Sequence, residues 1–129
     1  MQLFQKWLPI PVTTLADIVV MGCNQNQNTS FTVKNAGAAA LNGFEVWVRS
    51  HPDADYMKIA SIAADYTSPS GFLIAVKDVN GAAISPVTLA SAAEFVMTMD
   101  TRGIESVKLR ASCGTSTILN VYGNVGGDI

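Results

Sequence analysis

The segment HPDAD, residues 51–55, holds the densest group of side chains that could do chemistry in this chain. His51, Asp53 and Asp55 alternate along it, and carboxylate oxygens at such spacing are ligands for a hard cation such as calcium. A calcium site needs six or so oxygens, and the sequence offers neither a second carboxylate run nor an EF-hand pattern. We therefore interpret the segment as a solvated loop turned by Pro52, and expect no metal and no cofactor.

Catalytic patterns are equally sparse. The chain has one histidine, no G-x-S-x-G elbow and no recognisable pairing of a cysteine with that histidine. Nothing in the spacing of Glu45, Glu94 and Glu105 selects a carboxylate pair for glycoside chemistry. The glycines of residues 123–127 lack the lysine and the following helix of a phosphate-binding loop. We expect no catalytic residue and no enzymatic activity.

Trp47 and Arg49 are better candidates, for protein contact rather than for catalysis. In FEVWVRS, residues 44–50, they share one face and the apolar residues share the other. Tryptophan and arginine are enriched among the residues that dominate protein interfaces. The alternative is that Trp47 fills the core, as the tryptophan of an immunoglobulin-type sandwich does. The sequence leaves both interpretations open.

Composition argues against several classes of partner. The net charge is −2 and the chain spreads only eight lysines and arginines along its length, so we expect no nucleic-acid binding. The apolar run at residues 15–23 is interrupted by Asp17 and is far shorter than the roughly 20 residues that span a bilayer, so we expect no membrane insertion. Charged residues make up 14% of the chain and hydrophobic residues 49%, which favours self-association or docking on a larger surface.

The two cysteines, Cys23 and Cys113, lie far apart in sequence. The N-terminal residues do not resemble a signal peptide, because Lys6 and two prolines interrupt the apolar stretch. We therefore expect a chain made in the cytoplasm with two reduced thiols, and a disulfide between them is the alternative.

Patterns typical of β-strands cover most of the chain, so strands are expected to hold the candidate residues in place. Apolar and polar residues alternate in several segments, and Asn80-Gly81 is a strong hairpin signal. We expect strands within residues 12–21, 31–35, 44–50, 56–66, 72–84, 89–101, 105–113 and 116–125. Residues 56–66 also fit a helical stripe, and the last strand is apolar on both faces, which predicts a central or covered position. Seven to nine short strands without a convincing helix predict an all-β protein, an antiparallel β-sandwich of immunoglobulin-like or jelly-roll type, with a single domain over residues 12–129.

Residues 1–11 are predicted to form an N-terminal arm ahead of this domain. Phe4, Trp7 and Leu8 make the segment too apolar for a solvated tail. The arm either covers the open end of its own sandwich or packs on a neighbouring subunit. Phe4, Trp7 and Leu8 therefore join Trp47 and Arg49 as candidate protein-interface residues.

The succession FTVKNAG, LNGFEVWVRSHPDAD, TRGIESVKLRAS and NVYGNVGG resembles small β-sandwich structural proteins of tailed bacteriophages, including capsid decoration (cement) proteins. The resemblance implies a non-enzymatic virion protein that binds and stabilises the capsid shell. Its implied partners are the major capsid protein or another virion protein, and further copies of itself in a dimer or trimer. The implied location is the capsid exterior, after synthesis in the host cytoplasm.

Two alternatives stay open. Tail and head-tail junction proteins of the same viruses use similar sandwiches. A carbohydrate-binding module belongs to another class, and it requires Trp47 or a tyrosine exposed on a flat face.

Overall fold

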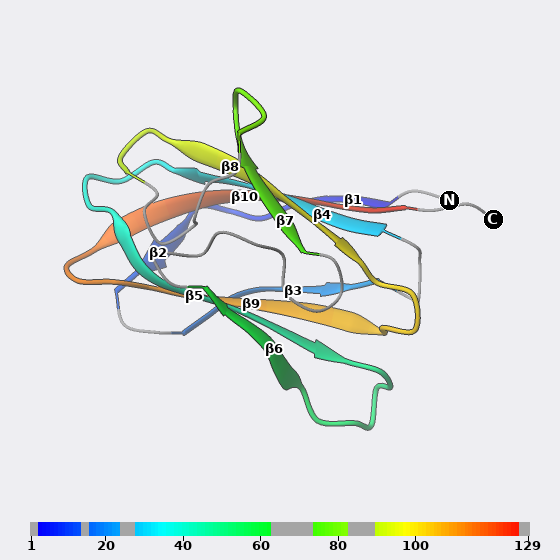
Figure 1. Ribbon diagram of the computed structural model, residues 1–129. Coiled ribbons are helices and arrows are strands. Elements are labelled where there is room, and N and C mark those ends of the chain that lie inside the picture. Colours follow the sequence, from blue (N-terminus) through cyan, green and yellow to red (C-terminus); the bar gives the residue numbers. More distant parts are fainter. Residues whose placement is uncertain (1–2, 14–15, 24–27, 63–73, 83–89, 127–129) are drawn as a thin grey trace.

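Strands dominate the computed structural model, which describes residues 3–13, 16–23, 28–62, 74–82 and 90–126. These residues form ten β-strands in two antiparallel sheets that face each other (Figure 1). Within the same ranges there is no helix long and apolar enough to cross a membrane. The predicted all-β sandwich is confirmed.

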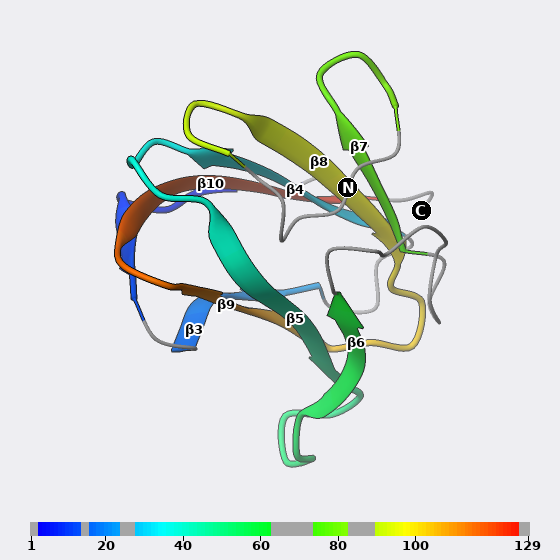
Figure 2. The same ribbon diagram turned by 60° about the vertical axis from the view of Figure 1, so that its left-hand side comes forward.

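The larger sheet has six strands and the smaller has four, and Figure 2 shows the same two layers from another side. The larger sheet has the order β1 (Leu3–Lys6), β10 (Thr117–Gly126), β4 (Asn28–Asn35), β8 (Glu94–Asp100) and β7 (Ala75–Asp78), and β2 (Ile10–Val12) also pairs with β10. The smaller sheet has the order β3 (Ala16–Gly22), β9 (Ser106–Cys113), β5 (Leu41–Arg49) and β6 (Met57–Ile62).

The strand order separates the two predicted types of sandwich. From β2 to β10 the chain changes sheet at almost every connection, and β2-β10-β4-β8 faces β3-β9-β5-β6. This is the order of a jelly roll, with β1 and β7 as added edge strands. The fold is therefore a jelly-roll sandwich rather than an immunoglobulin-like one.

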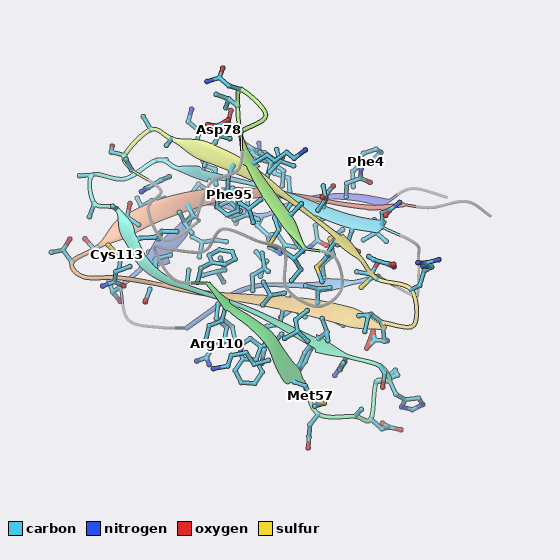
Figure 3. All side chains as sticks on the ribbon, in the orientation of Figure 1. Phe4, Met57, Asp78, Phe95, Arg110 and Cys113 are labelled. Carbon is cyan, nitrogen blue, oxygen red and sulfur yellow. The ribbon has the colours of Figure 1, made fainter. Side chains whose placement is uncertain are left out.

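The core lies between the sheets, where the inward residues of each strand meet (Figure 3 labels Phe95 between the layers). Phe44 of β5 and Phe95 of β8 pack edge to face across the gap, with ring centroids 5.6 Å apart. The predicted alternations are confirmed, since their apolar positions are the buried ones: Phe31, Val33, Phe44, Val46, Val48, Phe95, Met97, Met99, Val107, Leu109, Ala111 and Cys113. β10 is central, as its two apolar faces predicted, because it pairs with β1 and β2 on one side and β4 on the other.

Some predicted boundaries differ. The single strand predicted over residues 12–21 is two strands, because Val12 ends β2 in one sheet and β3 begins at Ala16 in the other. The segment predicted over 56–66 forms strand β6, and its last residues lie outside the described ranges. The turn at Asn80-Gly81 is present, with Gly81 at a φ of 80°, while the strand predicted after it lies outside those ranges.

Candidate functional site

The five predicted interface residues lie in two different sheets of the sandwich. Phe4, Trp7 and Leu8 belong to β1 and the chain that follows it, in the six-stranded sheet. Trp47 and Arg49 belong to β5, in the four-stranded sheet. Figure 3 shows Phe4 on the outer side of one layer and Arg110, a neighbour of Trp47, on the outer side of the other. The structure therefore does not bring the five together into one site.

Trp47 lies on the outer face of the four-stranded sheet and is half-buried there. Its Nε1 donates a hydrogen bond to Glu45 Oε1 at 3.0 Å. The Lys108 Nζ lies 5.3 Å from the centre of the indole ring, and the Arg110 guanidinium carbon lies 5.6 Å from it. The alternative that Trp47 fills the core is wrong, because the neighbouring positions of β5 point inward; cations cover its ring instead.

Arg49 is also engaged within its own sheet. Its Nε donates to Glu105 Oε1 at 2.7 Å, and its guanidinium carbon lies 4.9 Å from the centre of the Tyr56 ring. The Lys108 Nζ lies 4.5 Å from the same ring. The Tyr56 hydroxyl is 2.8 Å from Ser106 Oγ. Arg49 therefore has an ion pair and an aromatic partner without any second protein.

Two carboxylates complete this network. Glu45 lies 3.7 Å from Lys58 Nζ and 3.6 Å from Arg110 Nη1. Asp17 Oδ2 lies 3.8 Å from Lys108 Nζ. Asp17 Oδ1 lies 3.0 Å from Arg110 Nε, as an ion pair rather than a hydrogen bond.

We call this surface the charged face. Its members are Asp17, Glu45, Trp47, Arg49, Tyr56, Lys58, Glu105, Lys108 and Arg110. Each of its charged groups has a partner of opposite sign or an aromatic ring within the face. Single exposed ion pairs contribute about 0–1 kcal/mol, whereas a half-buried network is more ordered. The charged face is therefore best explained as a stabilising layer.

The outer side of the six-stranded sheet has a different character. The strand register places Lys6, Tyr122, Thr32, Val96 and Lys77 side by side on β1, β10, β4, β8 and β7. Tyr122 is 41% exposed and Val96 is 39% exposed, so this row offers apolar surface in its centre. Lysines stand at both of its ends.

The neighbouring row has little charge. It contains Phe4, Asn124, Ser30, Thr98 and Ala75, again one residue from each strand. Phe4 is 75% exposed. We call the two rows, with Ile118, Asn120, Lys34 and Glu94 beside them, the open face.

The open face has fewer internal partners for its charges than the charged face. Lys6 Nζ lies 5.9 Å from the centre of the Tyr122 ring, and Lys34 stands opposite Glu94 in the strand register. Lys6, Lys34, Lys77 and Glu94 form no ion pair with any residue in the part of the chain that the structure describes. Serine, threonine and asparagine fill most other positions of the face. A weakly charged surface with exposed aromatic and aliphatic side chains is typical of protein-docking sites.

Leu8 borders the open face because the chain carries one extra residue there. Lys6 pairs with Tyr122 and Ile10 pairs with Leu119, so four steps along the N-terminal segment match three along β10. Such a bulge re-aims a side chain, and Leu8 is 85% exposed. Beside it lies a groove of about 400 Å³ lined by Lys6, Trp7, Leu8, Pro9, Asn120 and Tyr122.

Trp7 points the other way and covers its own sandwich. Its backbone N–H donates to the Val121 carbonyl at 3.1 Å, and its ring centroid lies 6.2 Å from that of Phe31. Gly123 makes room for the indole, because a Cβ at that position would lie 2.9 Å from the Trp7 ring and 2.7 Å from Met21 Sδ. From residue 3 onward, the segment predicted as an arm is thus an edge of the sheet that presents Phe4 and Leu8 outward.

The HPDAD loop joins β5 to β6 and projects from the smaller sheet (Figure 1). The Asp53 N–H donates to His51 Nδ1 at 3.0 Å, and the side chains of His51, Asp53 and Asp55 are exposed. Across the described ranges, no three histidine, cysteine or acidic side chains gather where they could hold a metal ion.

The two cysteines are buried thiols that lie too far apart to bond to each other. Cys113 ends β9, whereas the Cys23 N–H donates to the carbonyl of Glu105, just before β9 begins. An eight-residue strand at about 3.3 Å per residue separates them by roughly 25 Å, and a disulfide needs Cα atoms within about 7 Å. Burial raises the pKa of the Cys23 thiol to about 11.

Comparisons with known proteins give one informative likeness. No protein-family model matches the chain, and no curated protein is similar to it in sequence. The crystal structure of the SPBc2 prophage-derived protein YomS is similar to it, with a TM-score of 0.55 and 12% sequence identity, over 97% of this chain and 92% of that one. At this identity the likeness shows a shared fold. It is a likeness to a prophage-derived protein and not to a decoration-protein family.

Sequence reasoning missed most of the open face. Its residues come from five strands, and only the register brings them together. One signal was present, since Ile118 and Tyr122 give β10 the apolar outer positions that predicted a covered strand. That signal did not say which neighbouring residues would lie beside them.

Proposed function

We propose that this protein is a non-enzymatic structural component of a bacteriophage virion and that it docks on the particle through the open face. The observation that carries the proposal is the contrast in ion pairing, because the lysines of the open face form no ion pair with the described residues and stand beside exposed Tyr122 and Val96. The finer proposal is a decoration protein on the capsid exterior, with the major capsid protein as its partner. A phage origin is supported by the fold that the chain shares with a prophage-derived protein.

Trp47 and Tyr56 on the charged face do not support a sugar-binding role, whereas Tyr122, which is 41% exposed on the open face, still meets the requirement of the carbohydrate-binding alternative. Sugars stack on exposed aromatic rings, whereas Lys108 and Arg110 lie over Trp47. Arg49 and Lys108 lie over Tyr56 in the same way. Docking through the open face needs no such rearrangement.

The proposal is tested by co-sedimentation of the purified protein with particles of the phage or prophage whose genome encodes it. Val96→Asp places a charge in the centre of the open face, and we expect it to reduce attachment at least about tenfold, because an unpaired charge in a desolvated contact is costly. Val20→Asp is the matched control, since Val20 is 48% exposed on the outer side of β3. It should attach like the wild type.

Two results would contradict the proposal. One is a wild-type protein that attaches to no particle. The other is loss of attachment in Val20→Asp while Val96→Asp still attaches, because the docking surface would then be the charged face.

The number of copies per particle separates the two virion locations. Hundreds of bound copies support a decoration protein, and a single ring supports a tail or head-tail junction protein. Deletion of residues 1–11 is a poor test of docking, because it removes β1, most of β2 and Trp7 from the folded sandwich.

A further inference from the structure

The edges of the two sheets show which strand is open to pairing with another chain. In the described part of the molecule these edges are β1 with β2, and β7, in the larger sheet, and β3 and β6 in the smaller one. An edge strand exposes unpaired backbone N–H and C=O groups, and natural proteins block such edges with proline, charge, bulges or short length.

Most of these edges carry a block. β2 contains Pro11, which has no N–H to donate. β3 has a shift in register between Asp17 and Val19, next to an outward carboxylate. β7 has charges at two of its four residues, Lys77 and Asp78, and β6 carries Lys58 and pairs with β5 through a register shift.

β1 has neither proline nor bulge within its length. It is as short as β7, but its sequence, Leu-Phe-Gln-Lys, has a single charge, and that charge is at its end. The Trp7 N–H donates to the Val121 carbonyl, so the alternation of an antiparallel ladder makes Gln5 the next residue bonded to β10. The N–H and C=O groups of Phe4 and Lys6 therefore point away from β10, toward the free edge.

From this geometry we infer that β1 pairs antiparallel with β1 of a second copy of this chain, about a two-fold axis at Gln5. In this register Phe4 of each copy lies opposite Lys6 of the other, and all four outward-pointing residues are used. The ladder joins the two six-stranded sheets into one. This pairing between two copies goes beyond the proposed docking on the phage particle. Docking is tested by co-sedimentation with particles, and pairing is tested by the oligomeric state of the purified chain.

Charge and side-chain chemistry favour a second copy as the occupant. An antiparallel pair keeps the two Lys6 side chains apart. Each ammonium lies 5.9 Å from the centre of the Tyr122 ring in its own copy, and pairing brings it beside the exposed Phe4 ring of the other copy for a second cation–π contact. The same edge on both chains gives the closed, two-fold symmetry that is commonest among oligomers. A net charge of −2 per chain adds little repulsion.

Pairing at β1 also extends the open face. Phe4 and Lys6 stand in its two rows, so the open faces of the two copies meet at the two-fold axis. A dimer then presents two linked docking surfaces, and linked surfaces attach more strongly than either one alone.

Sedimentation equilibrium of the full chain tests the inference. We expect the wild type to dimerise. Phe4→Pro removes an N–H that points out of the sheet and leaves the bonds to β10 intact, so it should weaken dimerisation about tenfold or more. Phe4→Thr keeps that N–H and should weaken dimerisation less. A wild type that is monomeric at all concentrations would overturn the inference, and so would a dimer unaffected by Phe4→Pro.

Cross-linking gives a second, independent readout. Gln5→Cys places two thiols opposite each other at the axis, so mild oxidation should produce a disulfide-linked dimer. Thr98→Cys is the control, because Thr98 is exposed on β8, away from the edge, and should not cross-link. Equal cross-linking of both variants would overturn the inference. Val96→Asp should still dimerise, so a failure of docking and a failure of dimerisation are distinguishable.

Discussion

The two outer surfaces of the sandwich are built from the same kind of element but treat their polar groups in opposite ways. On the charged face, each carboxylate and each cation has a partner within the face, and even Trp47 is covered. On the open face, Lys6 contacts the Tyr122 ring, but no lysine forms an ion pair inside the described part of the molecule, and Tyr122 and Val96 stay exposed. A face whose interactions are internally complete contributes to stability, and a face left incomplete is available to a partner.

Removal of an aromatic side chain from the open face should have the largest effect on docking. Tyr122→Ala should lower the affinity for the particle by about 30-fold, because aromatic residues central to an interface typically contribute about 2 kcal/mol or more. Its free energy of unfolding should change little, since the ring is partly exposed. Binding isotherms and urea denaturation check the two parts. An unchanged affinity would remove Tyr122 from the docking surface.

The reciprocal change removes the aromatic residue of the charged face. Trp47→Ala should lower the free energy of unfolding by about 1–2 kcal/mol. Lys108 and Arg110 lose their cation–π contacts with the indole ring, and Glu45 loses a hydrogen-bond donor. Particle affinity should stay within about twofold of the wild type. Trp47→Phe keeps a ring and should recover part of the stability. A large loss of affinity in Trp47→Ala would return this residue to the candidate interface.

A smaller effect is expected from a single carboxylate. Glu45→Gln removes the ion pair with Lys58 and one of the two ion pairs of Arg110, which keeps Asp17. It should cost about 0.5–1 kcal/mol at low salt, and the difference should shrink in 1 M NaCl, where charges are screened within about 3 Å. Glu94→Gln is the matched control, because Glu94 on the open face has no ion pair with the described residues. Equal losses in both variants would contradict the difference between the faces.

The smallest expected effect concerns the thiol of Cys23, the residue that follows β3. Burial raises the pKa of Cys23 from 9.0 to about 11, so folding favours the protonated thiol. Its contribution to stability is complete below pH 9 and is lost as the pH rises toward 11. The wild type should therefore lose stability relative to Cys23→Ala over that window, as denaturation at several pH values will show. Cys23 should also react slowly with iodoacetamide at pH 8 in the folded protein.

Local alternation was enough to predict the sandwich and most of its core. Val107, Leu109 and Ala111 are buried because strict two-residue periodicity assigns one side of a strand to the interior. Alternation did not show where Trp47 would lie, because a tryptophan suits either the core or a covered outer position. Its location depends on Lys108 and Arg110, which lie on a strand about 60 residues further along the chain.

The open face could not be predicted for a related reason. The topology of the whole chain decides which strands are neighbours. Thr32, Val96 and Tyr122 lie side by side in the sheet but far apart in the sequence. The N-terminal segment shows the same limit, since it was predicted as an arm ahead of the domain. β1 forms as a strand because it pairs with the edge of β10, and because the Trp7 ring that follows it packs against Phe31 and Gly123.

The close contact between Gly123 and the Trp7 ring limits how related sequences can differ. Gly123 has no side chain at the point where the Trp7 ring and Met21 Sδ approach it. A chain that acquires any larger residue at position 123 must give up the indole at position 7 or move the strand that carries it. The two positions should therefore change together among homologues, and a paired substitution there would mark the lineages in which the first strand has left the sheet.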